Sequence, residues 1–106
     1  MSNLESTIQA NILRYLKRIP KAYCVRPIVC HESGHPDIIA VINGQFVGIE
    51  VKRPGKKPTV LQRKRIDQII AAGGHAFVAF SVDDVKIELD KLRKLIKLSP
   101  SPYCNT

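Results

Sequence analysis

An Asn43-Gly44 pair between two β-prone segments is the feature that most constrains the fold of this 106-residue chain. The segments cover residues 37–42 and 45–52, and an Asn-Gly pair suits the two-residue type I′ turn of a β-hairpin. A turn of two residues fixes the register, because the residues that flank it must face each other and every outward step preserves the pairing. The sequence therefore predicts an antiparallel hairpin with one defined register.

This register places two carboxylates opposite each other. Asp37 and Glu50 face one another on the same side of the predicted hairpin, with their β-carbons roughly 5 Å apart. Lys52 lies two residues beyond Glu50, so the strand period of two returns its side chain to the same face, where Gly48 is expected to leave room. A solvent-exposed polar face with a Glu50–Lys52 ion pair is the structural alternative.

Opposed carboxylates call for a positive charge between them. Like charges that face each other across a β-ladder destabilise it, and a divalent cation removes that penalty. A hard ion such as Mg²⁺ binds one or two carboxylates and keeps water and phosphate oxygens as its other ligands. Asp37 and Glu50 are therefore candidate metal ligands, and the Lys52 ammonium could orient a water or offset charge that develops on a phosphate.

Hydrophobic periodicity predicts a helix before this hairpin. Apolar side chains recur at steps of three and four from about residue 3 to residue 19, and Pro20 is expected to close the helix. Residues 22–29 are β-prone but contain Pro27, which cannot donate a hydrogen bond to a β-ladder. We therefore expect this segment to form an edge strand or a strand with a bulge.

A helix, a strand and a final helix are expected after the hairpin. Thr59 and Gln62 form a capping-box pattern that opens a helix, a Gly-Gly pair ends it, and residues 75–80 form a short strand. Strand, helix and strand in succession imply a right-handed crossover to a parallel neighbour. Residues 81–98 show the apolar stripe of an amphipathic helix, formed by Leu92, Leu95, Ile96 and Leu98.

These elements predict an α/β fold in the order α-β-β-β-α-β, with a mixed four-stranded sheet flanked by helices and an added C-terminal helix. We expect a single domain over residues 1–106, with a frayed tail from 98 to 106, because the chain is too short for two independent cores. No apolar run is long enough for a membrane span, and the polar start does not resemble a signal peptide. A cytoplasmic protein without membrane contact is expected.

Charge favours a nucleic-acid partner. Lys and Arg number 17 against 9 Asp and Glu, which leaves a net charge of +8 and favours binding to a polyanion. A basic loop and the helix after it flank the proposed site, and a solvated charged face is the alternative reading. Few aromatic residues lie among these cations, so stacking on single-stranded bases is not expected. The candidate phosphate-binding residues, which would not read sequence, are Arg53, Lys56, Lys57, Arg63, Lys64 and Arg65.

The cysteines indicate neither a disulfide framework nor a zinc ribbon. Their number is odd, with Cys24, Cys30 and Cys104, and none is part of a CxxC pair, so reduced thiols are expected. Cys24 and Cys30 could join His31 and His35 around zinc, but this spacing matches no standard zinc site. Buried or incidental residues are the favoured interpretation.

The candidate site residues together resemble a known nuclease pattern. Pro36-Asp37, a spacer of twelve residues and Glu50-Val51-Lys52, with a helical Glu5 before and Gln62 after, resemble the PD-(D/E)xK nuclease superfamily. Gly34-His-Pro-Asp37 and Ile49-Glu-Val-Lys52 resemble more specifically the VRR-NUC domain, the virus-type replication-repair nuclease, in its stand-alone form. The resemblance covers about residues 5–80 and implies a restriction-endonuclease-like core.

The resemblance also implies roles for individual residues. Mg²⁺ or Mn²⁺ would be held by Asp37, Glu50, the backbone carbonyl of Val51 and Glu5, while Lys52 would assist the attacking water. Gln62 would be a further active-site residue. Capping boxes offer a structural alternative for two of these, because Ser2 with Glu5 and Thr59 with Gln62 both match that pattern. His35 could lie near the scissile phosphate or be an ordinary loop histidine.

The function implied by the resemblance is metal-dependent, structure-selective cleavage of DNA in a bacterial or phage-infected cell. A homodimer that resolves four-way (Holliday) junctions is expected, since one chain offers one site and paired cuts need two. The stripe on the final helix would supply apolar surface for the partner, or would pack on its own core. The alternatives are a nuclease for flaps or other branched DNA, and a non-catalytic basic module that binds nucleic acid.

Overall fold

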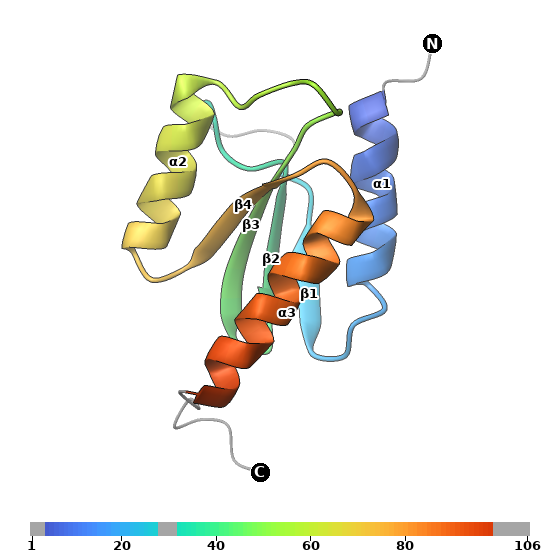
Figure 1. Ribbon diagram of the computed structural model, residues 1–106, viewed down its shortest axis with the longest axis vertical. Coiled ribbons are helices and arrows are strands. Elements are labelled where there is room, and N and C mark those ends of the chain that lie inside the picture. The colour runs from blue at the N-terminus through green and yellow to red at the C-terminus, as the bar shows by residue number, and fades with distance from the viewer. Residues whose placement is uncertain (1–3, 28–31, 99–106) are drawn as a thin grey trace.

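Three helices and four strands make up the part of the chain that the structure describes. The computed structural model describes residues 4–27 and 32–98, and for residues 96–98 the backbone alone. The elements follow the expected order (Figure 1): α1 (Leu4–Leu16), β1 (Ala22–Val25), β2 (Ile38–Ile42), β3 (Gln45–Val51), α2 (Val60–Ala71), β4 (His75–Ala79) and α3 (Val82–Leu98).

The strands form one mixed sheet in the order β1-β2-β3-β4. β1 and β3 both run antiparallel to β2, while β4 lies parallel to β3 after the crossover through α2. The predicted hairpin register is confirmed, because Ile38 pairs with Ile49 and Ile42 with Gln45. Asn43 and Gly44 have φ angles of 50° and 82°, as a type I′ turn requires at both central positions.

The two faces of the sheet carry different layers. One face packs against α1 and α3, and its core includes Ile12, Leu16, Ile49, Val85 and Leu89, all of which are buried. The other face packs against α2, so the strands lie between α2 and α1 in Figure 1. Because successive strand residues alternate between faces, the residues of β3 that flank Ile49 point toward the α2 side.

Two elements end earlier than the sequence predicts. α1 stops at Leu16 rather than residue 19, because Arg18 N donates to Tyr15 O and Ile19 N to Leu16 O in a tighter final turn. A turn then leads to β1, which ends at Val25 rather than at residue 29. Residues 28 and 29 of the predicted strand lie outside the described part of the chain. The expectation for α1 fails because local hydrogen bonds close the helix before Pro20 is reached.

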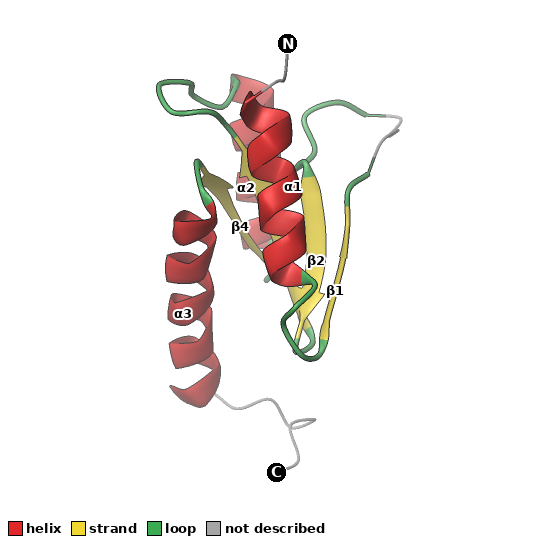
Figure 2. Ribbon diagram, turned by 90° about the vertical axis from the view of Figure 1, so that its right-hand side faces the viewer, coloured by secondary structure: helices red, strands yellow, loops and turns green. Residues whose placement is uncertain are grey.

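The apolar stripe of α3 divides between the core and the surface. Leu92 is buried against the sheet, whereas 57% of Leu95 is exposed. The side chains of Ile96 and Leu98 fall outside the described residues, as does the tail from 99 to 106, although Leu98 is the last residue of α3. Figure 2 shows α3 and α1 along the sheet. Within residues 4–27 and 32–98, no helix combines the length and the apolar character that crossing a membrane would require.

Candidate functional site

The candidate catalytic residues meet where β2 begins and β3 ends. Asp37 directly precedes β2, Glu50 is the last residue but one of β3, and Lys52 follows β3. Extending the pairing of Ile38 with Ile49 by one step places Asp37 opposite Glu50. The N-terminus of α1 lies at the same end of the sheet (Figure 1). The structure therefore brings the two carboxylates and the lysine together on the α2 face.

Glu50 is buried. Only 2% of the residue is exposed, and its Oε1 atom has no hydrogen-bond partner. The solvent exposure that the alternative reading assumed is therefore wrong for this residue, although the Glu50–Lys52 ion pair of that alternative is present. An ionised carboxylate is costly to keep out of water, and the Lys52 ammonium, 3.9 Å from Oε2, leaves Oε1 without a partner. The site therefore favours a proton on Glu50 or a further cation beside it.

The environment of Glu50 raises its pKa from 4.5 to about 8. Burial is the largest cause, because it removes water from the charged form. The neighbouring Asp37 charge raises the pKa further, as does a side-chain hydrogen bond with Asp37, which can form only when a proton lies between the two carboxyl groups. Lys52 lowers the pKa and Glu5 raises it slightly. Without a metal, Glu50 holds a proton at neutral pH.

Asp37 is fixed against the strand that carries Glu50. Its Oδ2 atom accepts a hydrogen bond from Val51 N at 2.9 Å. In a β-strand the N–H and C=O groups of one residue point to the same side. The Val51 carbonyl therefore points toward the Asp37 side of β3, so a carbonyl oxygen and two carboxyl groups converge on this end of the sheet.

Among the described residues, Lys52 is the only basic residue whose side chain forms an ion pair with Glu50. Its Nζ lies 3.9 Å from Glu50 Oε2, and 13% of its side chain is exposed. Lys52 N donates to Ala79 O at 3.1 Å, which extends the β3–β4 ladder by one residue beyond β3. The backbone at Lys52 is thus held by the sheet, and its ammonium is partly shielded from solvent.

Gly48 does not leave open space on this face, contrary to prediction. A β-carbon there would lie 3.0 Å from Pro36 Cγ and 3.2 Å from Ile69 Cδ1. The missing side chain instead lets Pro36 and Ile69 pack directly on β3. Because Pro36 precedes Asp37, this close approach helps to set the position of the Asp37 carboxylate.

Glu5 lies close to the site but does not complete a cluster of three acids. Its Oε2 is 3.5 Å from Arg53 N, and its charge contributes to the raised pKa of Glu50. Among the residues that the structure describes, no group of three or more His, Cys, Asp or Glu side chains is placed to hold a metal ion. A ligand role for Glu5 stays a prediction, and its alternative capping partner Ser2 lies outside the described residues.

Gln62 serves the cap of α2. Its Oε1 accepts a hydrogen bond from Thr59 N at 2.9 Å, and Gln62 N donates to Thr59 Oγ1 at 3.1 Å. Both bonds of the capping box are present, which matches the structural alternative considered for this residue. The capping box therefore accounts for the Gln62 side chain, and an active-site role for it stays a prediction.

The basic residues divide into two groups. Arg65 is engaged within the fold, because its Nε donates to Ser33 O at 3.1 Å and its Nη2 lies 3.0 Å from Glu32 Oε2. It ties α2 to the loop before Asp37. A phosphate contact from Arg65 stays a prediction. The remaining candidates are exposed, on the loop after β3 and on α2: Arg53, Lys56, Lys57, Arg63 and Lys64.

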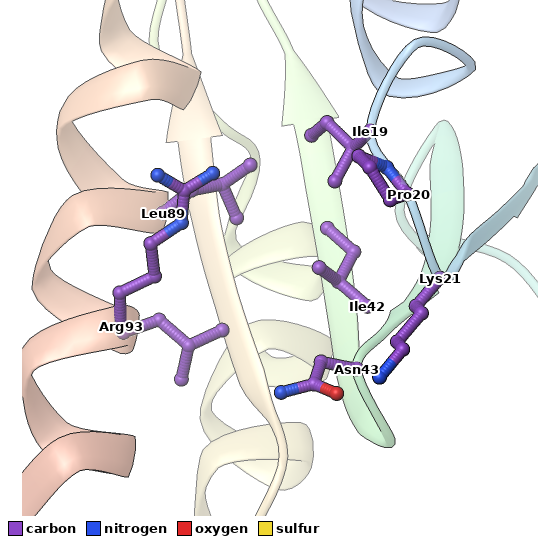
Figure 3. A pocket seen from close by; sticks show the side chains of 8 residues that line it. Ile19, Pro20, Lys21, Ile42, Asn43, Leu89 and Arg93 are labelled. Atoms are coloured by element: carbon purple, nitrogen blue, oxygen red, sulfur yellow. The ribbon is translucent and has the colours of Figure 1, made fainter. Parts of the chain in front are cut away.

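Two hollows lie beside the candidate site residues, and a third lies at the opposite end of the sheet. A polar one of about 330 Å³ borders Asp37 and includes the exposed His35. A second, of about 560 Å³, lies between the basic loop and β4. A third, of about 400 Å³, lies at the opposite end of β2 and β3, where Ile19, Leu89 and Arg93 surround it beside Asn43 (Figure 3). This third hollow contains none of the candidate site residues.

The zinc hypothesis gains no support from the described residues. Cys24 is a half-buried free thiol on β1. Cys30 and His31 lie outside the described part, as does Cys104. One functional candidate was missed by the sequence analysis altogether: Phe80, which the β3–β4 pairing brings beside the basic loop. No local motif marks it, since it lies far along the chain from that loop.

Comparison with known proteins relates the chain to solved structures, two of which are described below. A scan of family models finds no match to the sequence, and a search of curated proteins also finds none. One structure, a "VRR_NUC domain", aligns with a TM-score of 0.73 and 20% identity over 84% of this chain and 97% of that one. Another, a "VRR_NUC domain protein", aligns with a TM-score of 0.68 and 22% identity over 93% of each chain. At these identities the likeness is one of fold.

Proposed function

We propose that this chain, which has the fold of VRR_NUC domains, is a metal-dependent nuclease that hydrolyses the phosphodiester bonds of DNA. The observation that carries the proposal is the buried Glu50 carboxyl, with its unpartnered Oε1, opposite Asp37. Such a pair is unfavourable unless protonated or neutralised by a cation. A fold needs no such pair for its own stability, so its presence supports a catalytic role.

The residues present suit a hard divalent ion. Asp37, Glu50 and the Val51 carbonyl offer only oxygen ligands, which Mg²⁺ and Mn²⁺ prefer, and few enough of them to leave positions for water and a phosphate. Glu5 lies close enough to influence the charge at Glu50. When bound, the ion would supply a Lewis acid for the phosphate and lower the pKa of a coordinated water.

Lys52 contributes charge at a fixed position. Its ammonium lies 3.9 Å from Glu50 Oε2 and is largely shielded from water, which strengthens its interaction with a nearby anion. A phosphate beside the carboxylates would receive a hydrogen bond from Lys52 Nζ as negative charge develops on its oxygens. The hydrogen bond from Lys52 N to Ala79 O holds the backbone of Lys52, and Asp37 is itself held by the Val51 amide.

DNA is the proposed substrate. The net charge of +8 and the exposed cations that continue directly from Lys52 provide phosphate contacts that do not depend on sequence. We further propose that the working unit is a homodimer that makes paired cuts in branched DNA, with the four-way junction as the first candidate and flaps as the alternative. Support for the dimer comes from the one candidate site found within the described residues, since paired cuts need two, and from the exposed Leu95 on α3.

Cleavage with and without metal tests the proposal. Wild-type protein is incubated with linear, flapped and four-way DNA in Mg²⁺, Mn²⁺ or EDTA, beside Lys52→Ala and the matched control Lys91→Ala. Lys91 carries the same charge on the surface of α3, with 69% of its side chain exposed. We expect metal-dependent cleavage that Lys52→Ala lowers by about 10²-fold or more and Lys91→Ala leaves unchanged. DNA binding without cleavage under any condition would support the non-catalytic module instead.

A further inference from the structure

An apolar hollow of about 560 Å³ lies beside the strand that carries Glu50. Val78 on β4 and Phe80 just after it line one side, and Val60 in the first turn of α2 lines the other. Val78 pairs with Glu50 in the parallel register, so the hollow begins one strand spacing, about 4.8 Å, from the carboxylate strand. Paired residues point to the same face, which places the hollow on the face of the candidate site.

Two of these apolar side chains are unusually open to solvent. Val60 is 90% exposed and Phe80 is 36% exposed. Phe80 is nevertheless well positioned, because its backbone N–H donates to Asp84 Oδ2 at 2.8 Å at the start of α3. The hollow therefore presents an aromatic side chain on a fixed backbone and an exposed aliphatic side chain, and the described part of the chain leaves both partly open to solvent.

Cations border this apolar surface on the side of the basic loop and α2. Lys56 and Lys57 border the hollow from the loop, and Arg63 borders it from the second turn of α2. The other lining residues are uncharged, with no acid among them. The ligand that such a surface fits is an anion with an apolar planar group attached. The cations would bind its charged group, and the Phe80 ring and Val60 would pack against its planar group.

We propose that this hollow binds one unstacked nucleobase of the DNA, next to the phosphate that is cut; the inference rests on the proposed function. A regular duplex offers phosphates to the cations but keeps its bases stacked inside, so none of its bases would contact Phe80 or Val60. A branch point or an unpaired strand frees a base to stack on Phe80, and stacking of this kind tolerates any base. The sequence alone argued against such stacking, because Phe80 joins the basic loop only through the pairing of β4 with β3. The hollow thus gives the enzyme a preference for branched or unpaired DNA without sequence readout.

Binding of two oligomers that differ only in their bases tests the inference. Fluorescence anisotropy in EDTA measures the affinity for a labelled oligothymidylate of roughly twelve nucleotides and for an abasic oligomer of the same length and charge. We expect wild-type protein to prefer the thymidylate by about tenfold. Phe80→Ala and Val60→Ser should each reduce that preference to about threefold or less. Ile70→Ser, at the other end of α2 and 53% exposed, is the matched control and should keep it.

The outcomes separate this inference from the nuclease proposal. Equal affinity of the wild-type protein for the two oligomers would overturn the base site, even if the protein cuts DNA. A base preference that depends on Phe80 and Val60 would support the site even if no cleavage is found. Val60→Ser keeps the test decisive should Phe80→Ala fail to fold, because Val60 is almost fully exposed. If sedimentation shows that the wild-type protein is a dimer and that Val60→Ser dissociates it, the hollow is an interface between two copies of the chain and the inference is overturned.

Discussion

Replacing Glu50 by glutamine should make the metal-free protein more stable at alkaline pH. The pKa of Glu50 is about 8 in the folded protein and 4.5 as its ordinary value, so folding favours the protonated form. Without metal, the stabilisation from this proton is complete below pH 4.5 and is lost progressively as the pH rises toward 8. The glutamine amide is neutral at every pH and can donate to Asp37, as the protonated acid does.

The magnitude follows from the two pKa values. Raising the pKa from 4.5 to about 8 corresponds to about 5 kcal/mol at roughly 1.4 kcal/mol per pH unit. This is an upper limit, because any rearrangement that hydrates the ionised Glu50 reduces it. A loss of several kcal/mol is a large part of the stability of a small domain, which is about 5–15 kcal/mol.

Urea denaturation in EDTA between pH 5 and 9 measures the effect. We expect the free energies of unfolding of Glu50→Gln and wild type to differ by less than about 1 kcal/mol at pH 5. At pH 9 the free energy of unfolding of the variant should be higher by several kcal/mol. Mn²⁺ at pH 8 should stabilise the wild type more than the variant. Asp90→Asn, which removes a carboxylate with 68% side-chain exposure, is the control and should follow the wild-type curve. Parallel curves for Glu50→Gln and wild type would refute the reasoning.

Three further predictions concern catalysis, binding and assembly. Asp37→Asn should abolish cleavage while largely keeping DNA affinity, as measured by anisotropy, because its amide oxygen can still accept from Val51 N; turnover near the wild-type level would contradict this. DNA affinity should fall steeply with salt, and reversing the charge of Lys56 or Lys64 should weaken binding to all sequences alike. An affinity that does not change with salt would exclude binding through phosphate contacts. Sedimentation should show a homodimer, and a cruciform plasmid should be cut on both strands before release; a monomer that only nicks would remove the resolvase proposal.

The hairpin and its register were predictable because the determining signal is local. Asn43 and Gly44 set the turn, and the turn sets which residues face each other. The capping box at Thr59 was equally local and formed as expected. The opposed positions of Asp37 and Glu50 followed from the register alone, without knowledge of the tertiary structure.

The features that the sequence did not predict depend on distant segments. Glu50 appeared to lie on a polar face, but α2 packs on that side of β3, and a central strand between two layers is buried on both faces. Gly48 appeared to leave space that Pro36 and Ile69 in fact fill. Phe80 joins the basic loop only through parallel pairing of β4 with β3. None of these contacts leaves a periodic pattern in the sequence.

The most direct test of the metal site is the number of protons released when Mn²⁺ binds. Calorimetric titration in buffers of different ionisation enthalpy measures this number. Because the pKa of Glu50 is about 8 and a metal ligand must be deprotonated, binding at pH 7 should release about 0.9 proton per ion, and binding at pH 9 only about 0.1. Glu50→Gln should bind Mn²⁺ far more weakly and release no such proton. Equally tight binding by the variant, or binding at pH 7 without proton release, would contradict the assignment of Glu50 as a metal ligand.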